Sequence, residues 1–252
     1  MIPPDPRRRP GDSIAIPGDY QARALNSTRK AQRFWHSAKF RLIERVAQPG
    51  PDDRVLDAGC GSGTISHFLA QAAGSVVAID SNLAAIEFAR ATYREPNLSF
   101  LHGQFDEIRN QGCFDRIYCV EVLEHLYLEQ AVAVLTLFHD AAASASQLFI
   151  TTPNYRSTWP LIEKVLDLLH LVPKLDTDQH VTHFSRRRLI DACRKAGWSV
   201  TVVGGFNGLA PFLAPVSNAF ALTWEKLEYR LRYFLPQNLL FCVCTKVESL
   251  PA

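Results

Sequence analysis

The stretch Val55-Leu-Asp-Ala-Gly-Cys-Gly-Ser-Gly63 joins a short apolar run to three alternate glycines. Glycine lets the backbone approach a bound molecule closely, where a side chain would clash. A helix expected after the third glycine offers unpaired N–H groups, and Asp80 ends a second apolar run, Val76–Ile79. A carboxylate in that place can accept hydrogen bonds from both hydroxyls of a ribose. Together the strand, the glycines, the helix and the acid predict a nucleoside-binding βαβ unit.

The chain has the size and composition of one folded domain. Its 252 residues are 47% hydrophobic, enough to bury a substantial core. A formal charge of +2 gives no reason to expect nucleic acid as a partner. Residues 1–19, rich in Pro, Gly and Asp around Arg7–Arg9, predict a flexible leader without the apolar core of a signal peptide. We therefore expect a single domain over residues 20–252 of a cytoplasmic protein, whose oligomeric state the sequence does not indicate.

The cysteines and the longest uncharged stretch indicate in which part of the cell the protein is expected. The six cysteines form no C-x-x-C pair and lie mostly inside apolar patterns, so we expect reduced core residues. No charged side chain occurs from Trp198 to Trp224, but glycines and prolines interrupt this stretch. A lipid-exposed helix tolerates such interruptions poorly, which argues against a membrane span there.

Strand and helix patterns alternate along the chain. We expect strands near 54–58, 76–80, 98–102, 114–120, 147–152, 198–204 and 238–246. Helical patterns run from Gln21 to the residues before Pro49, and then near 63–72, 82–93, 129–142 and 185–196. This alternation predicts an α/β fold, a parallel sheet with helices on both faces. Long insertions at about 153–182 and 206–237 should form a lid over the substrate site.

The glycine spacing separates two classes of nucleotide-binding enzyme. A dinucleotide fingerprint places its glycines as G-x-G-x-x-G, which disfavours a nicotinamide dehydrogenase. The segment Asp57-Ala-Gly-Cys-Gly-Ser-Gly63 instead resembles motif I of the class I S-adenosylmethionine-dependent methyltransferases. That resemblance implies a Rossmann-like, seven-stranded, mostly parallel sheet whose antiparallel last strand inserts beside the sixth. It also implies S-adenosyl-L-methionine as cofactor and S-adenosyl-L-homocysteine as product.

A second segment narrows the resemblance. Cys119-Val-Glu-Val-Leu-Glu-His125 is similar to the Cys-Met-Glu-Met-Leu-Glu-His segment of the ubiquinone-biosynthesis O-methyltransferases. Their pattern also has an arginine shortly before motif I, where this chain has Arg41, and a guanidinium suits the methionine carboxylate. Parts of 157–180 resemble that family's insertion after the fifth strand, whereas 206–237 does not. The resemblance implies that Arg41, Gly59, Asp80 and Val120 contact the cofactor.

Other residues near these motifs complete a predicted cofactor site. Asp57 should orient the glycine loop or bind the cofactor's ammonium group. Gln104 can hydrogen-bond the adenine amino group and Phe105 can stack on the ring, although the family often has Gly-Asp here. The full predicted set is Arg41, Asp57, Gly59, Cys60, Gly61, Gly63, Asp80, Ser81, Gln104, Phe105 and Val120.

The acceptor side offers candidates for proton transfer. A phenol has a pKa near 10, so its methylation benefits from removal of the proton. His125 follows the fourth strand and is the best candidate for the base, although a structural role is equally open for each histidine. No metal site is predicted, because His180 and His183 lack partners at zinc-ligand spacing. The predicted catalytic residues are His125, Glu121 and His180, and the predicted substrate residues are Asn154, Tyr155 and His183.

These observations favour a methyltransferase acting on an oxygen of a small lipophilic acceptor, quinone-like or phenol-like. A sugar, a lipid-linked glycan or an antibiotic-type metabolite is an alternative acceptor, and a non-catalytic cofactor-binding scaffold is an alternative from another class. Both insertions have apolar faces with basic neighbours: Lys164 and Lys174 in the first, Arg230 and Arg232 in the second. Such surfaces can lie on the inner face of a membrane, with core burial or a dimer contact as equally open alternatives.

Overall fold

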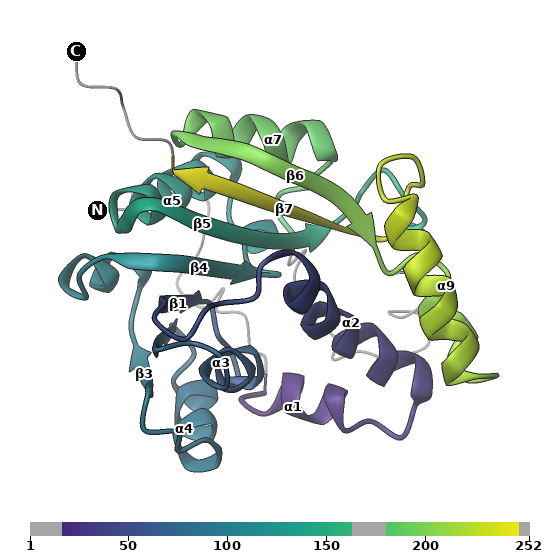
Figure 1. Cartoon of the computed structure of the whole chain (residues 1–252), viewed down its shortest axis with the longest axis horizontal. Helices are drawn as coiled ribbons and strands as arrows, with labels where there is room; N and C mark the ends of the chain where they lie inside the picture. Colours follow the sequence, from purple (N-terminus) through teal and green to yellow (C-terminus); the bar gives the residue numbers. More distant parts are fainter. Residues whose placement is uncertain (1–16, 163–179, 247–252) are drawn as a thin grey trace.

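Seven strands form one sheet in the order β3-β2-β1-β4-β5-β7-β6 (Figure 1). The computed structural model describes residues 17–162 and 180–246. The strands are β1 Arg54–Ala58, β2 Ser75–Asp80, β3 Leu98–His102, β4 Phe114–Val120, β5 Ala142–Pro153, β6 Trp198–Phe206 and β7 Leu239–Lys246. The pairs from β3 to β5 are parallel, and β7 runs antiparallel to β5 and β6. The predicted fold class is confirmed, including the antiparallel last strand beside the sixth.

The strand order reverses at β1, because the chain passes from β3 at one edge to β4 on the other side of β1. In open α/β sheets, ligands bind outside the carboxyl ends of the strands at such a reversal. The ends of β1 and β4 therefore mark where a site is expected.

Helices pack against both faces of the sheet (Figure 1). Their bounds are α1 Tyr20–Leu25, α2 Lys30–Val46, α3 Thr64–Ala70, α4 Leu83–Thr92, α5 Leu128–Asp140, α7 Arg186–Lys195, α8 Ala210–Leu213 and α9 Asn218–Arg230, with the short 3-10 helices η1 Phe105–Asn110 and η2 Leu123–His125. The helix predicted from Gln21 is broken at residues 26–29. There Asn26 Nδ2 donates to the Ala22 carbonyl at 3.0 Å and Ser27 Oγ accepts from Arg29 N at 3.1 Å. These side chains compete with the helical backbone bonds.

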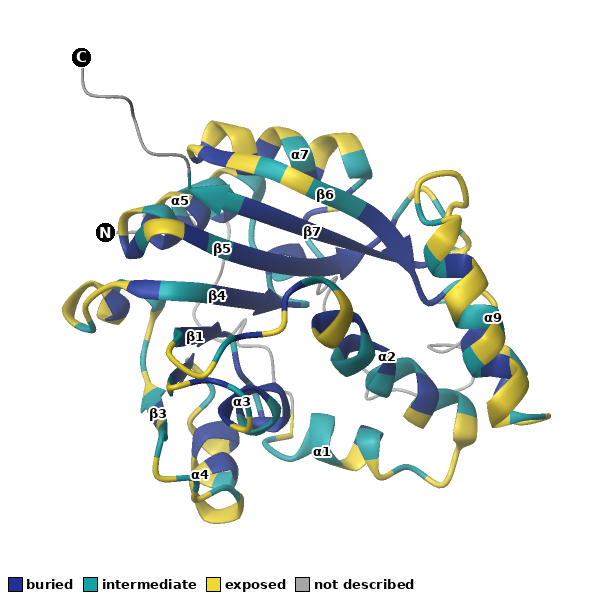
Figure 2. Cartoon of the chain, viewed as in Figure 1, coloured by how far each residue is buried: buried dark blue, intermediate teal, exposed yellow. Residues whose placement is uncertain are grey.

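Alternate residues of the strands supply two cores. β5 and β7 are buried along most of their length (Figure 2). Leu56 packs on the face covered by α5 and α7, together with Phe138 and Trp198. Its neighbour Val55 packs on the opposite face, with Ile43 of α2. Because successive side chains of a strand point to opposite faces, a strand covered on both faces needs apolar residues at consecutive positions, as at Val55 and Leu56.

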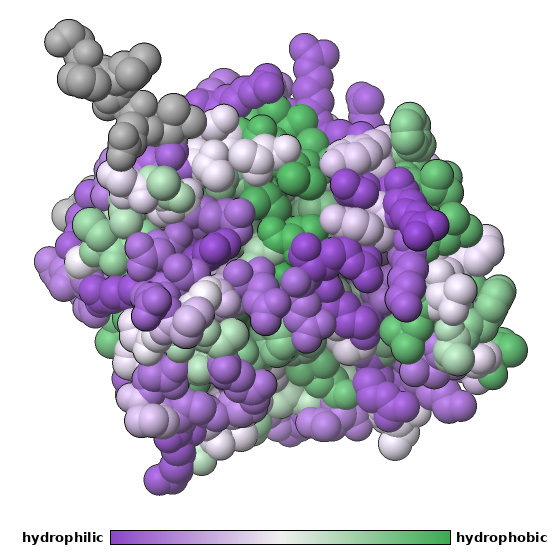
Figure 3. Space-filling model, in the orientation of Figure 1, coloured by the Kyte–Doolittle hydropathy of each residue, from purple (hydrophilic) through white to green (hydrophobic). Residues whose placement is uncertain are grey.

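The insertion at 206–237 contains α8 and α9 and carries exposed apolar side chains. Val216 is 85% exposed, Phe234 82% and Phe220 51%. In the space-filling view, hydrophobic residues reach the surface at the right-hand side, where α9 lies (Figure 3). Within the described parts of the chain, no helix is both long enough and apolar enough to cross a bilayer.

Most of the predicted leader and of the first insertion, residues 1–16 and 163–179, lie outside the described residues, and Lys164 and Lys174 lie there too. Residues 17–19 form a turn before α1. Gly18 sits so close to the carbonyl of Ala84 in α4 that a Cβ there would collide with it. The end of the predicted leader is thus packed against the domain.

Candidate active site

The glycine loop, residues 59–63, connects β1 to α3. Gly59, Gly61 and Gly63 have φ of +79°, +50° and +78°, a region that residues with side chains rarely adopt. A Cβ at Gly59 would also collide with Val122, which follows β4. The backbone N–H groups of Gly59 and Cys60 donate to the carbonyl of Ile79 at 2.8 and 3.1 Å, which holds the loop against β2.

Asp80 lies at the end of β2 with its carboxylate against this loop. Its Oδ2 accepts from Gly61 N at 2.7 Å and its Oδ1 accepts from Asn82 N at 2.8 Å. A carboxylate has about four acceptor sites, so both oxygens can accept further hydrogen bonds. Asp80 is partly exposed, and Ser81 beside it is exposed. The position suits the predicted binding of ribose hydroxyls.

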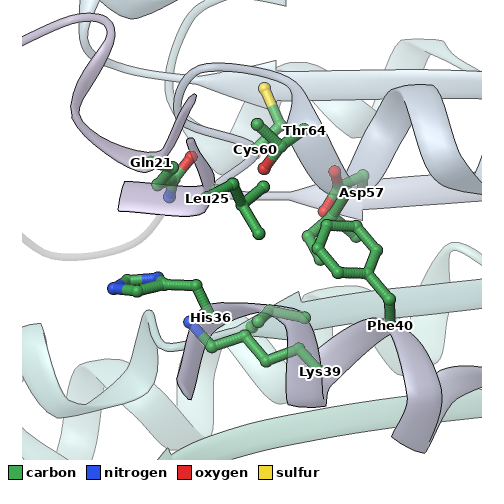
Figure 4. A pocket seen from close by; sticks show the side chains of 11 residues that line it. Gln21, Leu25, His36, Lys39, Phe40, Asp57, Cys60 and Thr64 are labelled. Atoms are coloured by element: carbon green, nitrogen blue, oxygen red, sulfur yellow. The ribbon is translucent and has the colours of Figure 1, made fainter. Parts of the chain in front are cut away.

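A hollow opens beside the glycine loop, and we call it the loop hollow (Figure 4). Its empty volume of about 390 Å³ includes space open to solvent, and small-molecule sites span about 300–1,000 Å³. It is lined by Gln21, Leu25, His36, Lys39, Phe40, Asp57, Gly59, Cys60, Thr64, Ile65 and Val120. Sequence analysis predicted Asp57, Gly59, Cys60 and Val120 among these.

The helices α1 and α2 supply lining residues that sequence analysis missed. Gln21 Oε1 accepts from Ser62 N at 2.9 Å and from Ser62 Oγ at 3.2 Å, so α1 lies across the loop. On α2, the signal was present as an i, i+3, i+4 spacing of His36, Lys39 and Phe40, which places the three on one face.

Asp57 is buried beneath the hollow and accepts a hydrogen bond from Ser66 Oγ of α3 at 2.6 Å. Burial raises the pKa of Asp57 to about 7; the Ser66 hydrogen bond opposes this shift and the charge of Asp80 adds to it. A cationic group in the hollow would favour the ionised form. The contacts thus allow both predicted roles of Asp57, in orienting the loop and in binding an ammonium group.

An ion pair between the buried Lys39 and the partly exposed Glu121 crosses from α2 to the end of β4. Lys39 Nζ donates to Glu121 Oε2, and Glu121 has a left-handed backbone with φ of +55°. Burial by itself raises the pKa of Glu121, but the charges of Lys39 and His36 outweigh it and bring the pKa below the ordinary value. Burial, helped by the charge of Lys39, lowers the pKa of His36 to about 4, so this imidazole is neutral at pH 7.

The structure does not bring Arg41 to the loop hollow. Its guanidinium makes a two-pronged ion pair with Glu225 of α9, at 2.7 Å from Nε and 3.0 Å from Nη2. Its Nη1 donates to Ser37 Oγ at 2.8 Å, and the group lies 4.5 Å from the ring centre of Phe34. Two residues that are two positions apart on an α-helix are separated by about 200° around the helix axis. Lys39 and Arg41 therefore face opposite sides of α2.

The two predicted adenine contacts lie at the end of β3. Gln104 is exposed. Phe105 packs against the core, with its ring edge-on to Phe138 at 5.7 Å between centroids. Neither lines the loop hollow, although β3 pairs with β2 so that His102 lies opposite Asp80. Their contacts with adenine stay predictions.

The predicted base lies in a group that we call the imidazole cluster: Glu124, His125 and His180. The His125 and His180 ring centroids are 5.1 Å apart, and the potential ligand atoms of all three residues lie within 4.8 Å of one another. Glu124 is buried, and its Oε2 has no hydrogen-bond partner among the described residues. Burial raises the pKa of Glu124 to about 7. Two imidazoles and a carboxylate can also hold a transition-metal ion, a grouping that the His180–His183 spacing did not reveal.

Residues after β5 support this cluster. Tyr155 Oη lies 2.8 Å from His180 Nδ1, and the Tyr155 ring stacks on His183 at 3.9 Å between centroids. Asn154 is buried, and its Nδ2 donates to the Gln237 carbonyl at 2.8 Å. Asn154 therefore anchors the chain near the start of β7, and Tyr155 is the predicted substrate residue that reaches the cluster.

Comparison with known proteins agrees with this geometry. Residues 28–203 match the family described as methyltransferase domain. A ubiquinone biosynthesis O-methyltransferase of Aromatoleum aromaticum is 30% identical over 161 residues, covering 61% of this chain and 67% of that protein. One from Pseudomonas aeruginosa is 31% identical over 117 residues, covering 45% and 49%. The chain spans about half the length, or less, of the curated relatives that match it first.

Solved structures show the same fold. A magnesium protoporphyrin IX methyltransferase from Synechocystis, with bound S-adenosylhomocysteine, has a TM-score of 0.60 at 17% identity and covers 91% of this chain and 94% of that one. A putative methyltransferase in complex with the Haloferax volcanii Trm112 activator has a TM-score of 0.63 at 19% identity and covers 94% and 100%.

The residues in place fit S-adenosylmethionine. The glycine loop leaves room for close approach, and Asp80 offers acceptors to a ribose. The loop hollow carries the ammonium of Lys39 and the carboxylate of Asp57 for a methionine end. With the match over residues 28–203, the chain belongs to the methyltransferase domain family, among the class I S-adenosylmethionine-dependent methyltransferases.

Proposed function

We propose that this chain methylates an oxygen of a small lipophilic acceptor that carries a phenol-like or quinone-like ring. The observation that carries the proposal is the imidazole cluster, which stands just beyond the end of β4. Glu121 lies between the imidazole cluster and the loop hollow. It forms an ion pair with Lys39, and a positive charge on His180 would lower the pKa of Glu121. The O-methyltransferase names of the curated relatives support the same chemistry.

The cofactor supplies an activated methyl group on a sulfonium. The protein aligns the acceptor oxygen with it and keeps water out. His125 takes the hydroxyl proton, and the ionised Glu124 carboxylate stabilises the resulting imidazolium. Tyr155 holds His180 through the 2.8 Å contact and so keeps the second ring beside His125.

Aromatic side chains lead from the surface to this cluster. Exposed Phe212 of α8 lies 6.5 Å from Trp35, which lies 5.4 Å from Trp159, all between ring centroids. Trp159 in turn lies 6.5 Å from His180. The buried Nε1 of Trp159 has no hydrogen-bond partner among the described residues. This row favours an acceptor with an apolar body and an oxygen that can accept from the indole.

The acceptor class is tested with methyl-labelled cofactor and fractionated extracts. Label should appear in phenolic compounds of the lipid fraction. Label confined to water-soluble sugars or metabolites would favour the alternative acceptors. Cofactor binding without transfer to any fraction would favour a non-catalytic scaffold.

We further propose that the protein works at the inner face of an anionic membrane, on a surface that we call the outer stripe: Val216, Phe220, Leu227, Leu231 and Phe234. Phe220, Leu227 and Leu231 are spaced seven and four apart, so Leu231, the residue directly after α9, lies on the same side as Phe220 and Leu227 of the helix. All five are exposed.

The charges around the outer stripe favour an anionic bilayer as its partner. In 206–237 both acids are turned inward, since Glu225 pairs with Arg41 and Glu228 is buried, whereas Lys226 and Arg230 are exposed. A symmetric dimer built on this stripe would bring like charges together, but an anionic bilayer complements them.

Flotation with liposomes tests the outer stripe. The wild type should float with vesicles that contain phosphatidylglycerol, and Phe220→Glu should reduce the bound fraction about tenfold or more, because burial of one phenylalanine contributes roughly 1.5–3 kcal/mol. Leu83→Glu on α4 is a matched control, since Leu83 is 48% exposed and Phe220 51%. A wild type that stays in solution, or that forms a dimer broken by Phe220→Glu, would overturn the membrane proposal.

A further inference from the structure

The helix α2 presents two cations in opposite directions. Lys39 faces the loop hollow and is 6% exposed, and Arg41 faces α9. The resemblance to the ubiquinone-biosynthesis enzymes implies Arg41 as the partner of the methionine carboxylate. From the placement of these two side chains we infer that Lys39 binds the carboxylate of S-adenosylmethionine in this protein. The inference rests on the cofactor occupying the loop hollow.

The surroundings of Lys39 suit a carboxylate. A buried ammonium requires anionic partners, and the described residues give Lys39 Nζ one, Glu121. An ammonium has three N–H donors, so Nζ can bind a second carboxylate without releasing Glu121. Lys39 lies across the loop hollow from Cys60 and Thr64, at the far side from the glycine loop (Figure 4).

The Arg41 guanidinium is already bound by residues outside the loop hollow. To reach the loop hollow it would have to give up both hydrogen bonds to Glu225, the bond to Ser37 and its position over Phe34. That movement would leave Glu225, whose side chain is 12% exposed, without its partner. Removing one partner of a well-buried ion pair is strongly unfavourable. Arg41 is therefore a residue that ties α2 to α9.

The charged residues that line the loop hollow suit the amino-acid end of the cofactor. His36 is neutral at pH 7, so Lys39 is the one cation among the described lining residues. Asp57 is the one acid among the same lining residues, and Glu121 lies outside the lining as the partner of Lys39. The ammonium of Lys39 and the carboxylate of Asp57 complement a ligand end that has one carboxylate and one ammonium. Lys39 would thus select for the amino-acid end of the cofactor, while Asp80 and the glycine loop hold its nucleoside end.

Two ligands that differ in this end test the inference by calorimetry. S-adenosylhomocysteine has the carboxylate, and 5′-methylthioadenosine has the same nucleoside and sulfur without it. We expect Lys39→Met to weaken S-adenosylhomocysteine about tenfold to a hundredfold and to leave methylthioadenosine within about twofold. Arg41→Met is the matched control on the same helix, and it should change neither the ratio of the two affinities nor the affinity for methylthioadenosine.

The possible results distinguish an error in the role of Lys39 from an error in the position of the cofactor site. If Arg41→Met, and not Lys39→Met, lowers the affinity for S-adenosylhomocysteine relative to that for methylthioadenosine, the role of Lys39 is overturned. Arg41 would then be the residue that binds the carboxylate. Failure of the wild type to bind either ligand would instead overturn the cofactor site. Lys39→Met removes the ion-pair partner of Glu121. If that single variant does not fold, the double variant Lys39→Met/Glu121→Gln is used in its place. The double variant should show the same selective loss of S-adenosylhomocysteine.

Discussion

Replacing His125 with alanine is expected to lower the rate of methyl transfer to a hydroxyl acceptor about a hundredfold, the usual contribution of a positioned general base. Affinity for S-adenosylmethionine should stay within about twofold, because His125 does not line the loop hollow. Initial rates with labelled cofactor, combined with calorimetry, separate the two effects. Unchanged rates in both His125→Ala and His180→Ala would reduce the two histidines to structural residues.

The pH dependence gives this prediction a second readout. Burial raises the pKa of Glu124 to about 7, so the carboxylate that stabilises the His125 imidazolium forms as the pH rises through 7. The rate should therefore increase across that range, and Glu124→Gln should remove the increase. Loss of activity on treatment with a chelator, restored by a divalent ion, would show instead that the imidazole cluster acts by binding a metal.

The second large effect is expected from Asp80→Ala, which should weaken both S-adenosylmethionine and S-adenosylhomocysteine. Losing the acceptors for two ribose hydroxyls costs about 1–3 kcal/mol, or roughly 5-fold to 150-fold in the dissociation constant. Calorimetry on the folded variant measures it directly.

Asp80 also holds Gly61 N and Asn82 N, so its loss could act through α4. The control is Asn82→Ala, which removes the side-chain cap on Ala85 N and leaves the Asp80 carboxylate in place. Equal losses in the two variants, or none in Asp80→Ala, would count against ribose binding by Asp80.

Most strands were predicted almost to the residue because they are short apolar runs between turns. β1, β3 and β4 have the predicted bounds, and β2 and β7 differ by one residue. β6 ends two residues later than predicted, and β5 begins five residues earlier, at Ala142, where the sequence predicted the end of a helix. The elements missed depend on individual side chains or on distant packing. Asn26 and Ser27 break a helix whose periodicity continues through them. α9 has an apolar outer side as well as a buried one, so it lacks the one-sided pattern by which a helix is found.

The residues of the candidate site likewise fall into those that local sequence predicts and those that depend on distant packing. The glycine loop, Asp57 and Asp80 could be predicted because one short segment and one strand end contain them. The choice between Lys39 and Arg41 could not, since it depends on how α2 is rotated, and Glu225, which binds Arg41, lies 184 residues away in sequence. The pairing of His180 with His125 likewise joins residues 55 positions apart in sequence, with α5 and β5 between them.

The position of β7 has a consequence for how the protein acquires its fold during synthesis. β6 pairs with β7 alone among the described strands, and β7 follows it by more than thirty residues. Until β7 leaves the ribosome, β5 presents an unpaired edge and β6 has no neighbour, and unpaired apolar edges favour aggregation. The nascent chain can form its nucleotide-binding half first, and we expect its last cooperative step to be the addition of β7, together with β6, to the open edge of β5.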